Sequence, residues 1–197
     1  MATGLAKTSM SSVISAIELY LIRHGIAAER GTYVNDDDRP LTPAGQTKTH
    51  AMADRLREQK LFFDTLVTSP LVRARETAAI LQGAGLAAQV ETWPELTPDR
   101  AIDPWLERYD QWRTQHLAQA AFPAKPSSRL RLALVGHEPT LSQWANQLIW
   151  GDGNPINDAR DTIVLKKAGI IGLILPPMGS PLGCSQLFWL TPPRLFL

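Results

Sequence analysis

The chain lacks the features that mark disulfide-rich, redox or membrane-spanning proteins. It has one cysteine, Cys184, among 197 residues, which excludes an internal disulfide framework and any paired-cysteine metal or redox motif. Its longest apolar runs, such as Ile170–Leu175, fall far short of the ~20 residues that span a bilayer. Because Cys184 lies in an apolar stretch rich in glycine and proline, we expect it to have a structural role.

An excess of charge of either sign is also lacking. The 20 basic residues and 19 acidic residues leave a formal net charge of +1, which argues against a protein that binds nucleic acid across a whole face. The type of cation is nevertheless uneven, since there are 14 Arg and only 6 Lys. Arginine holds phosphate or carboxylate through two parallel hydrogen bonds, so the positions of the arginines matter more than their sum.

The length and the 44% apolar content are those of one globular domain. The first sixteen residues contain one Lys, many Ser and Thr and no sustained apolar core. We therefore expect residues 1–16 to be a flexible N-terminal extension, residues 17–197 to form a single domain, and the protein to be cytoplasmic without a membrane partner.

Predicted strands and helices alternate along most of the chain. Apolar runs predict strands at residues 17–22, 64–68, 87–92 and 130–135. Helices are expected from Pro43 to about Gln59, after Ser69-Pro70, in the second half of residues 93–119, and behind the fourth strand, with Thr42 and Ser69 as N-caps. Residues 120–128 are expected to be a loop. Three short strands are expected at the C-terminal end, at residues 162–165, 170–175 and 186–190.

This order of elements predicts an α/β fold. We expect three layers, α/β/α, around a mostly parallel central sheet, with antiparallel strands added at the C-terminus. In such sheets, ligands bind at the carboxyl ends of the strands. That rule makes neighbours of His24, Arg73 and His137, each of which closely follows a predicted strand.

The residues around these strand ends suit an anionic ligand. Arg23 is adjacent to His24, and Gly25 would let the backbone approach a ligand closely. Arg39 precedes a helix entrance, where unpaired N–H groups favour an anion. Nearby positive charge lowers the pKa of an imidazole, so His24 is expected to be neutral and able to attack phosphorus.

Five motifs strengthen this interpretation. Leu21-Ile22-Arg23-His24-Gly25 resembles the RHG signature of the histidine phosphatase superfamily, which includes the phosphoglycerate mutases and the histidine acid phosphatases. Four further segments arrive in that superfamily's order, at residues 39–42, 69–77, 94–98 and 135–139. The acidic residues before Arg39, the Pro-Glu-Leu-Thr-Pro run and the short chain are most similar to the SixA-type phosphohistidine phosphatases. The resemblance is close over residues 17–140 and loose after about residue 155.

The resemblance implies a phosphoglycerate mutase-like fold and a role for each motif residue. His24 would be the nucleophile that takes the phosphoryl group, and His137 would complete the pocket and stabilise transition-state charge. The phosphoryl oxygens would be bound by Arg23, Arg39 and Arg73. No cofactor and no metal are expected, because phosphoryl transfer depends on positioning and charge stabilisation and the four His are more than twenty residues apart.

Some residues have alternatives. Arg39 could pair with the acidic residues 36–38 instead of a phosphate, and Arg75 is expected to face away from Arg73 on the helix. His50 and His116 are interpreted as ordinary helix residues. Glu95 could be a catalytic acid, a water-positioning base or a structural cap.

The substrate class depends on what covers the pocket. Only about 35 residues separate the third strand from the fourth, and they include Trp93, Trp105 and Trp112, which suit a small packed flap better than a deep lid. A shallow pocket favours phosphohistidine on a signalling protein, such as a histidine-containing phosphotransfer domain. The alternative is a phosphatase of small phosphomonoesters with Glu95 as general acid. A mutase is disfavoured because it must exclude water, and a pure phosphate-binding module has no need of His24.

Overall fold

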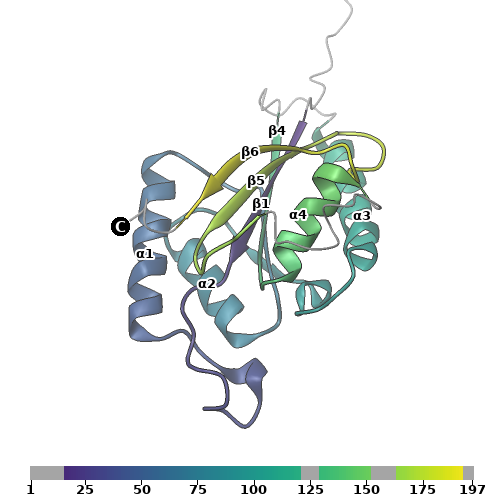
Figure 1. Ribbon diagram of the computed structural model, residues 1–197. Coiled ribbons are helices and arrows are strands. Elements are labelled where there is room, and N and C mark those ends of the chain that lie inside the picture. Colours follow the sequence, from purple (N-terminus) through teal and green to yellow (C-terminus); the bar gives the residue numbers. More distant parts are fainter. Residues whose placement is uncertain (1–15, 121–128, 152–162, 193–197) are drawn as a thin grey trace, which may run out of the picture.

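The computed structural model describes residues 16–120, 129–151 and 163–192, which form a six-stranded sheet with helices on both faces (Figure 1). The order of strands is β3-β2-β4-β1-β5-β6. Neighbouring strands are parallel from β3 to β1, and β5 and β6 are antiparallel to their neighbours. The strands are β1 Ala16–Arg23, β2 Thr65–Thr68, β3 Val90–Thr92, β4 Arg129–Gly136, β5 Ile170–Leu175 and β6 Gln186–Thr191.

In the described part of the chain, four α-helices cover the sheet in two pairs. They are α1 Pro43–Glu58, α2 Val72–Gly83, α3 Asp103–Ala120 and α4 Thr140–Trp150, with two 3₁₀ turns, η1 Asp36–Asp38 and η2 Pro94–Leu96. Alternate residues of β1 enter different cores, because successive side chains of a strand point to opposite faces. Leu19 and Leu21 pack with residues of α3 and α4, and Tyr20 and Ile22 pack with residues of α1 and α2. The predicted three-layer, mostly parallel α/β fold is confirmed.

The starts of two helices test the predicted caps. Thr42 is the N-cap of α1, and its hydroxyl accepts a hydrogen bond from the Gly45 amide at 3.0 Å. The cap predicted at Ser69 is wrong, because α2 begins at Val72 and Leu71 occupies the N-cap position without a side-chain bond. The Ser69 hydroxyl is directed to another partner, described below.

The C-terminal third departs from the expectation at its beginning. The strand predicted at residues 162–165 is wrong, because residues 163–165 are irregular. Residue 162 lies outside the described residues. The strands predicted at 170–175 and 186–190 are confirmed as β5 and β6. Cys184 is exposed at a turn between them and is not a core residue.

Two predicted segments fall largely or wholly outside the described residues. Of the expected N-terminal extension, only Ala16 is described, and it begins β1. Of the expected loop at 120–128, only Ala120 is described, as the last residue of α3. Within the described residues, no helix combines the length and the apolar character that crossing a bilayer requires.

The three tryptophans expected in a flap are core residues. Trp93, Trp105 and Trp112 are at most 4% exposed and pack in the same cluster as Trp144 of α4. The Trp112 indole donates a hydrogen bond to the Thr65 hydroxyl of β2 at 2.9 Å. Helix α3 therefore belongs to one of the helical layers of the fold, and the three tryptophans contribute to its core.

Candidate active site

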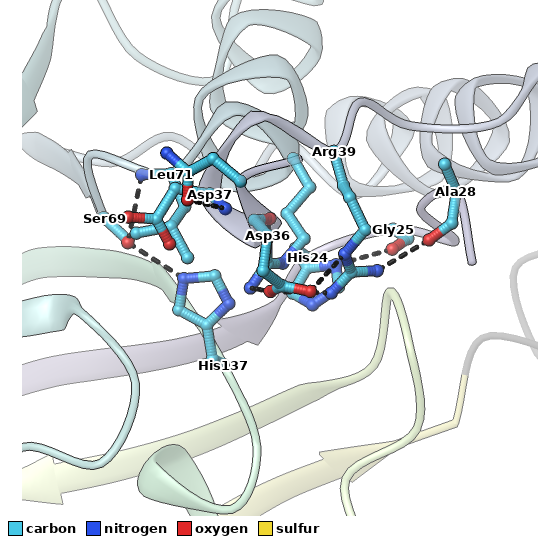
Figure 2. Close-up of polar contacts among 11 residues, drawn as sticks. His24, Gly25, Ala28, Asp36, Asp37, Arg39, Ser69, Leu71 and His137 are labelled. Atoms are coloured by element: carbon cyan, nitrogen blue, oxygen red, sulfur yellow. Dashed lines mark hydrogen bonds and ion pairs between the residues drawn. The ribbon is translucent and has the colours of Figure 1, made fainter. Parts of the chain in front are cut away.

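His24 follows the last residue of β1 and is held there by backbone bonds. Its amide donates to the Gly136 carbonyl at the end of β4 at 3.1 Å, and its ring Nδ1 lies 2.7 Å from the Gly25 carbonyl oxygen (Figure 2). A carbonyl oxygen can only accept a hydrogen bond, so Nδ1 carries the proton. The lone pair of the ring is consequently on Nε2, which makes that nitrogen the nucleophilic atom.

The surroundings of His24 keep its ring neutral. The residue is 7% exposed, and burial lowers its pKa to about 3, with Arg73, Arg23 and Lys167 adding to the effect and the Gly25 carbonyl opposing it. Burial disfavours the charged imidazolium, and nearby cations repel it. At physiological pH, Nε2 therefore keeps its lone pair.

His137 lies beside His24, as expected for two residues at the ends of neighbouring strands. The ring centroids are 5.1 Å apart. His137 Nε2 lies 2.9 Å from the Ser69 hydroxyl (Figure 2), and its buried Nδ1 has no hydrogen-bond partner among the described residues. Burial lowers the pKa of His137 to about 2, assisted by His24 and Arg73. The site therefore contains two neutral imidazoles side by side.

Arg23 is oriented by the irregular segment that precedes β5. Its guanidinium donates to the Leu165 carbonyl at 2.7 Å, and the Arg23 carbonyl accepts from the Ala168 amide at 3.1 Å. Burial lowers the pKa of Arg23, an effect that the charge of Glu138 opposes. The buried Nε of Arg23 has no partner among the described residues, so this donor is available to an acceptor in the site.

Arg39 and Arg73 are joined by one carboxylate, that of Asp36. Arg39 Nε and Nη2 donate to its two oxygens at 2.7 and 3.1 Å, and Arg39 Nη1 donates to the Ala28 carbonyl at 2.6 Å (Figure 2). Arg73 Nη2 lies 3.3 Å from Asp36 Oδ2, and its Nη1 donates to the Asp36 carbonyl at 2.8 Å. Both arginines are buried, at 7% and 3% exposed. The pairing of Arg39 with the acidic turn is therefore present, and it extends to Arg73.

Glu95 is not bonded to the other predicted site residues in the described part of the chain. It lies in η2, just after β3 and thus at the same edge of the sheet. Among the described residues, its buried Oε2 has no hydrogen-bond partner, and no hydrogen bond or ion pair joins it to the other five predicted site residues. Arg75 and His50 are exposed and His116 is half-buried on α3, as expected.

Two contacts and one electrostatic effect in the site were not expected from the sequence. The bond of Ser69 to His137 could have been found, because Ser69 directly follows β2 and strand ends converge. The contact of Asp36 with Arg73 and the effect of Lys167 on His24 join segments that carry no common pattern. Gly25 has a packing role that the sequence did not indicate, because a Cβ there would lie 2.5 Å from the Thr49 hydroxyl. The glycine lets α1 approach closely.

A cavity of about 760 Å³ opens beside Arg73 and Asp36. We call it the mouth cavity; it is lined by Arg30, Asp36, Asp37, Leu71, Arg73 and residues 97–100. This volume exceeds that of one phosphoryl group and leaves room for the remainder of a substrate.

Within the part of the chain that the structure describes, no three His, Cys, Asp or Glu side chains are grouped to hold a metal ion.

The sequence has relatives among known proteins. The family model of the histidine phosphatase superfamily (branch 1) matches residues 19–133. An uncharacterized protein of Picosynechococcus sp. is 42% identical over 158 residues, which cover 80% of this chain and 84% of that protein. The phosphohistidine phosphatase SixA of Escherichia coli is 35% identical over 86 residues, which cover 42% of this chain and 50% of SixA.

The fold has close counterparts among solved structures. The protein histidine phosphatase SixA complexed with tungstate superimposes with a TM-score of 0.71 at 21% identity, over 91% of this chain and 99% of the other. At that identity, the similarity concerns the fold. Its coverage of 91% of this chain extends past the residues matched by the family model.

Proposed function

We propose that this protein hydrolyses phosphohistidine in cytoplasmic signalling proteins, such as histidine-containing phosphotransfer domains. The chain belongs to the histidine phosphatase superfamily (branch 1), and this family together with its SixA-like relatives supports phosphatase activity. The observation that carries the proposal is the state of His24. Its Nδ1 proton is held by the Gly25 carbonyl at 2.7 Å, and burial together with the charges of Arg73 and Arg23 keeps its Nε2 unprotonated by lowering the pKa of the ring. This is the arrangement that covalent transfer of a phosphoryl group requires.

The proposed reaction has two displacements. In the first, His24 Nε2 forms a bond to phosphorus while the bond from phosphorus to the substrate imidazole breaks, and the leaving imidazole nitrogen takes a proton from solvent. In the second, a water oxygen attacks phosphorus, the bond to Nε2 breaks and the attacking water returns a proton to solvent. Inorganic phosphate and neutral His24 are the products.

The cations of the site would stabilise the charge that develops on the phosphoryl oxygens. Arg23 offers its unpartnered Nε, and Arg39 and Arg73 have guanidinium protons beyond those that bind Asp36 and Ala28. The unpartnered Nδ1 of His137 marks it as a further donor when that nitrogen carries the proton. Fixed donors of this kind lower the barrier to phosphoryl transfer, and the proposed mechanism therefore uses no metal.

A direct assay of substrates tests the proposal. The protein is incubated with a phosphorylated phosphotransfer domain and, separately, with a panel of small phosphomonoesters, and the release of phosphate is measured. We expect the phosphoprotein to be turned over with the higher kcat/KM, because the mouth cavity can contact groups around the phosphohistidine. Faster turnover of the esters would reject the phosphohistidine assignment.

A second candidate function is a phosphatase of small phosphomonoesters, and the burial of Glu95 Oε2 without a partner favours it. An alkoxide is a poor leaving group and needs a proton from an acid, whereas imidazole leaves readily once protonated. If Glu95 supplies that proton, Glu95→Gln lowers kcat on esters by about 10²-fold or more. The expected effect on a phosphohistidine substrate is less than about threefold, measured in the same assay.

The control for Glu95→Gln is Glu107→Gln, which removes an exposed carboxylate from α3. It should leave both activities unchanged. An equal loss on esters and phosphohistidine in Glu95→Gln would contradict the role of an acid specific to alkoxide leaving groups.

A further inference from the structure

Asp36 places a negative charge against the two arginines that the proposed function assigns to the phosphoryl group. Its carboxylate accepts from Arg39 at 2.7 and 3.1 Å and lies 3.3 Å from Arg73 Nη2. The two guanidiniums are buried, whereas the Asp36 side chain is 47% exposed. A phosphoryl group that binds these arginines must share them with this carboxylate or displace it.

We propose that Asp36 is a specificity-determining residue that weakens the binding of a bare phosphate and makes binding depend on the remainder of the substrate. The inference rests on the proposed function, since it takes Arg39 and Arg73 as the phosphoryl-binding residues. It goes beyond that function because it assigns a role to Asp36, which neither activates the nucleophile nor protonates the leaving group.

Asp36 weakens phosphate binding whether its carboxylate stays beside the arginines or is displaced by the phosphate. If Asp36 stays in contact with the arginines, its charge repels an incoming dianion. If Asp36 is displaced, the bonds that it makes with both guanidiniums must first be broken. Without the carboxylate, the two like charges repel each other, and binding of a phosphate relieves that repulsion. Removing the charge therefore favours the phosphate-bound form over the free form.

The consequence is a preference for substrates with large leaving groups. When the phosphoryl group alone binds weakly, contacts made by the rest of the substrate must supply the binding free energy. The mouth cavity, which Asp36 itself lines, is the place for those contacts. Free phosphate, which has nothing to place there, is then a weak product inhibitor.

The test replaces Asp36 with its isosteric amide. Binding of inorganic phosphate to the wild-type protein, to Asp36→Asn and to Asp38→Asn is measured by calorimetry. We expect Asp36→Asn to bind phosphate about threefold to tenfold more tightly. Asp38→Asn removes the same charge from the same turn at an exposed residue that, among the described residues, forms no hydrogen bond or ion pair with either arginine. Its affinity should equal that of the wild type.

Thermal unfolding provides a second readout. Asp36→Asn should unfold at a lower temperature without phosphate, because the arginine pair loses its counter-charge, and should gain more stability from added phosphate than the wild type does. Its kcat/KM should rise more for a small phosphoester than for a phosphorylated phosphotransfer domain. A merely structural role for Asp36 would lower the stability without tightening phosphate binding.

Four outcomes are decisive. Tighter phosphate binding by Asp36→Asn alone supports the inference. Equal or weaker binding overturns it and makes Asp36 a residue that orients Arg39 and Arg73. If neither the wild type nor the variants bind phosphate while the wild type hydrolyses the phosphorylated phosphotransfer domain, the inference is overturned and the proposed function stands. Absence of that hydrolysis overturns the proposed function.

Discussion

Replacing His24 with alanine should lower turnover of any phosphorylated substrate by at least about 10⁴-fold, because it removes the atom that forms the bond to phosphorus. The remaining arginines can still bind the substrate, so its affinity should change far less than kcat. The variant should also take up no acid-labile label from a substrate with radioactive phosphorus, since a phosphoramidate on His24 can no longer form. Rapid-quench labelling and steady-state kinetics measure the two effects.

His50→Ala is the matched control, because His50 is an exposed histidine on α1. It should keep wild-type kinetics and labelling. Full activity in His24→Ala would end the case for covalent catalysis, and labelling that persists in this variant would move the nucleophile to another residue.

Replacing Arg73 with alanine should lower kcat/KM by about 10³-fold, a loss of about 4 kcal/mol in the transition state. The guanidinium is 3% exposed and interacts with Asp36, and its charge lies near both histidines. Arg73→Lys should recover part of the loss, because lysine keeps the charge but not the planar fork that binds two oxygens. Kinetics on one substrate across the three proteins measure the series.

Arg75→Ala is the control for Arg73, since it removes the same side chain from an exposed position two residues further along α2. It should change kcat/KM by no more than about twofold. Because Arg73 is buried, thermal unfolding of each variant is measured alongside the kinetics. Wild-type kcat/KM in a folded Arg73→Ala protein would exclude Arg73 from the site.

The convergence of His24 and His137 could be predicted without coordinates. Each follows an apolar run of strand length, and parallel strands place their carboxyl ends at one edge of a sheet. The same rule locates Glu95 near that edge, after β3. The local chemistry of a helix start was also readable, since Thr42 followed by Pro43 is the cap of α1.

Contacts made by segments without a periodic pattern could not be predicted. The helix cap predicted at Ser69 was wrong, because α2 begins three residues later. The Ser69 hydroxyl instead lies 2.9 Å from His137 Nε2. The apolar residues near 163–165 resembled a strand, yet that segment stays irregular and its Leu165 carbonyl binds Arg23. When a polar side chain has two possible hydrogen-bond partners, the tertiary structure decides which of them it binds. The local sequence does not encode that geometry.

The sequence by itself determined the order of the elements and the identity of the chemical groups at the strand ends, because hydrophobic periodicity and strand direction are local properties that place those groups at one edge. Only the tertiary structure decided which charges face each other there. Asp36 and Arg73 are distant in the chain, and their contact depends on how the acidic turn packs against the start of α2. Electrostatic interaction depends on distance in space, so the balance of charge in this site became visible only in the folded chain.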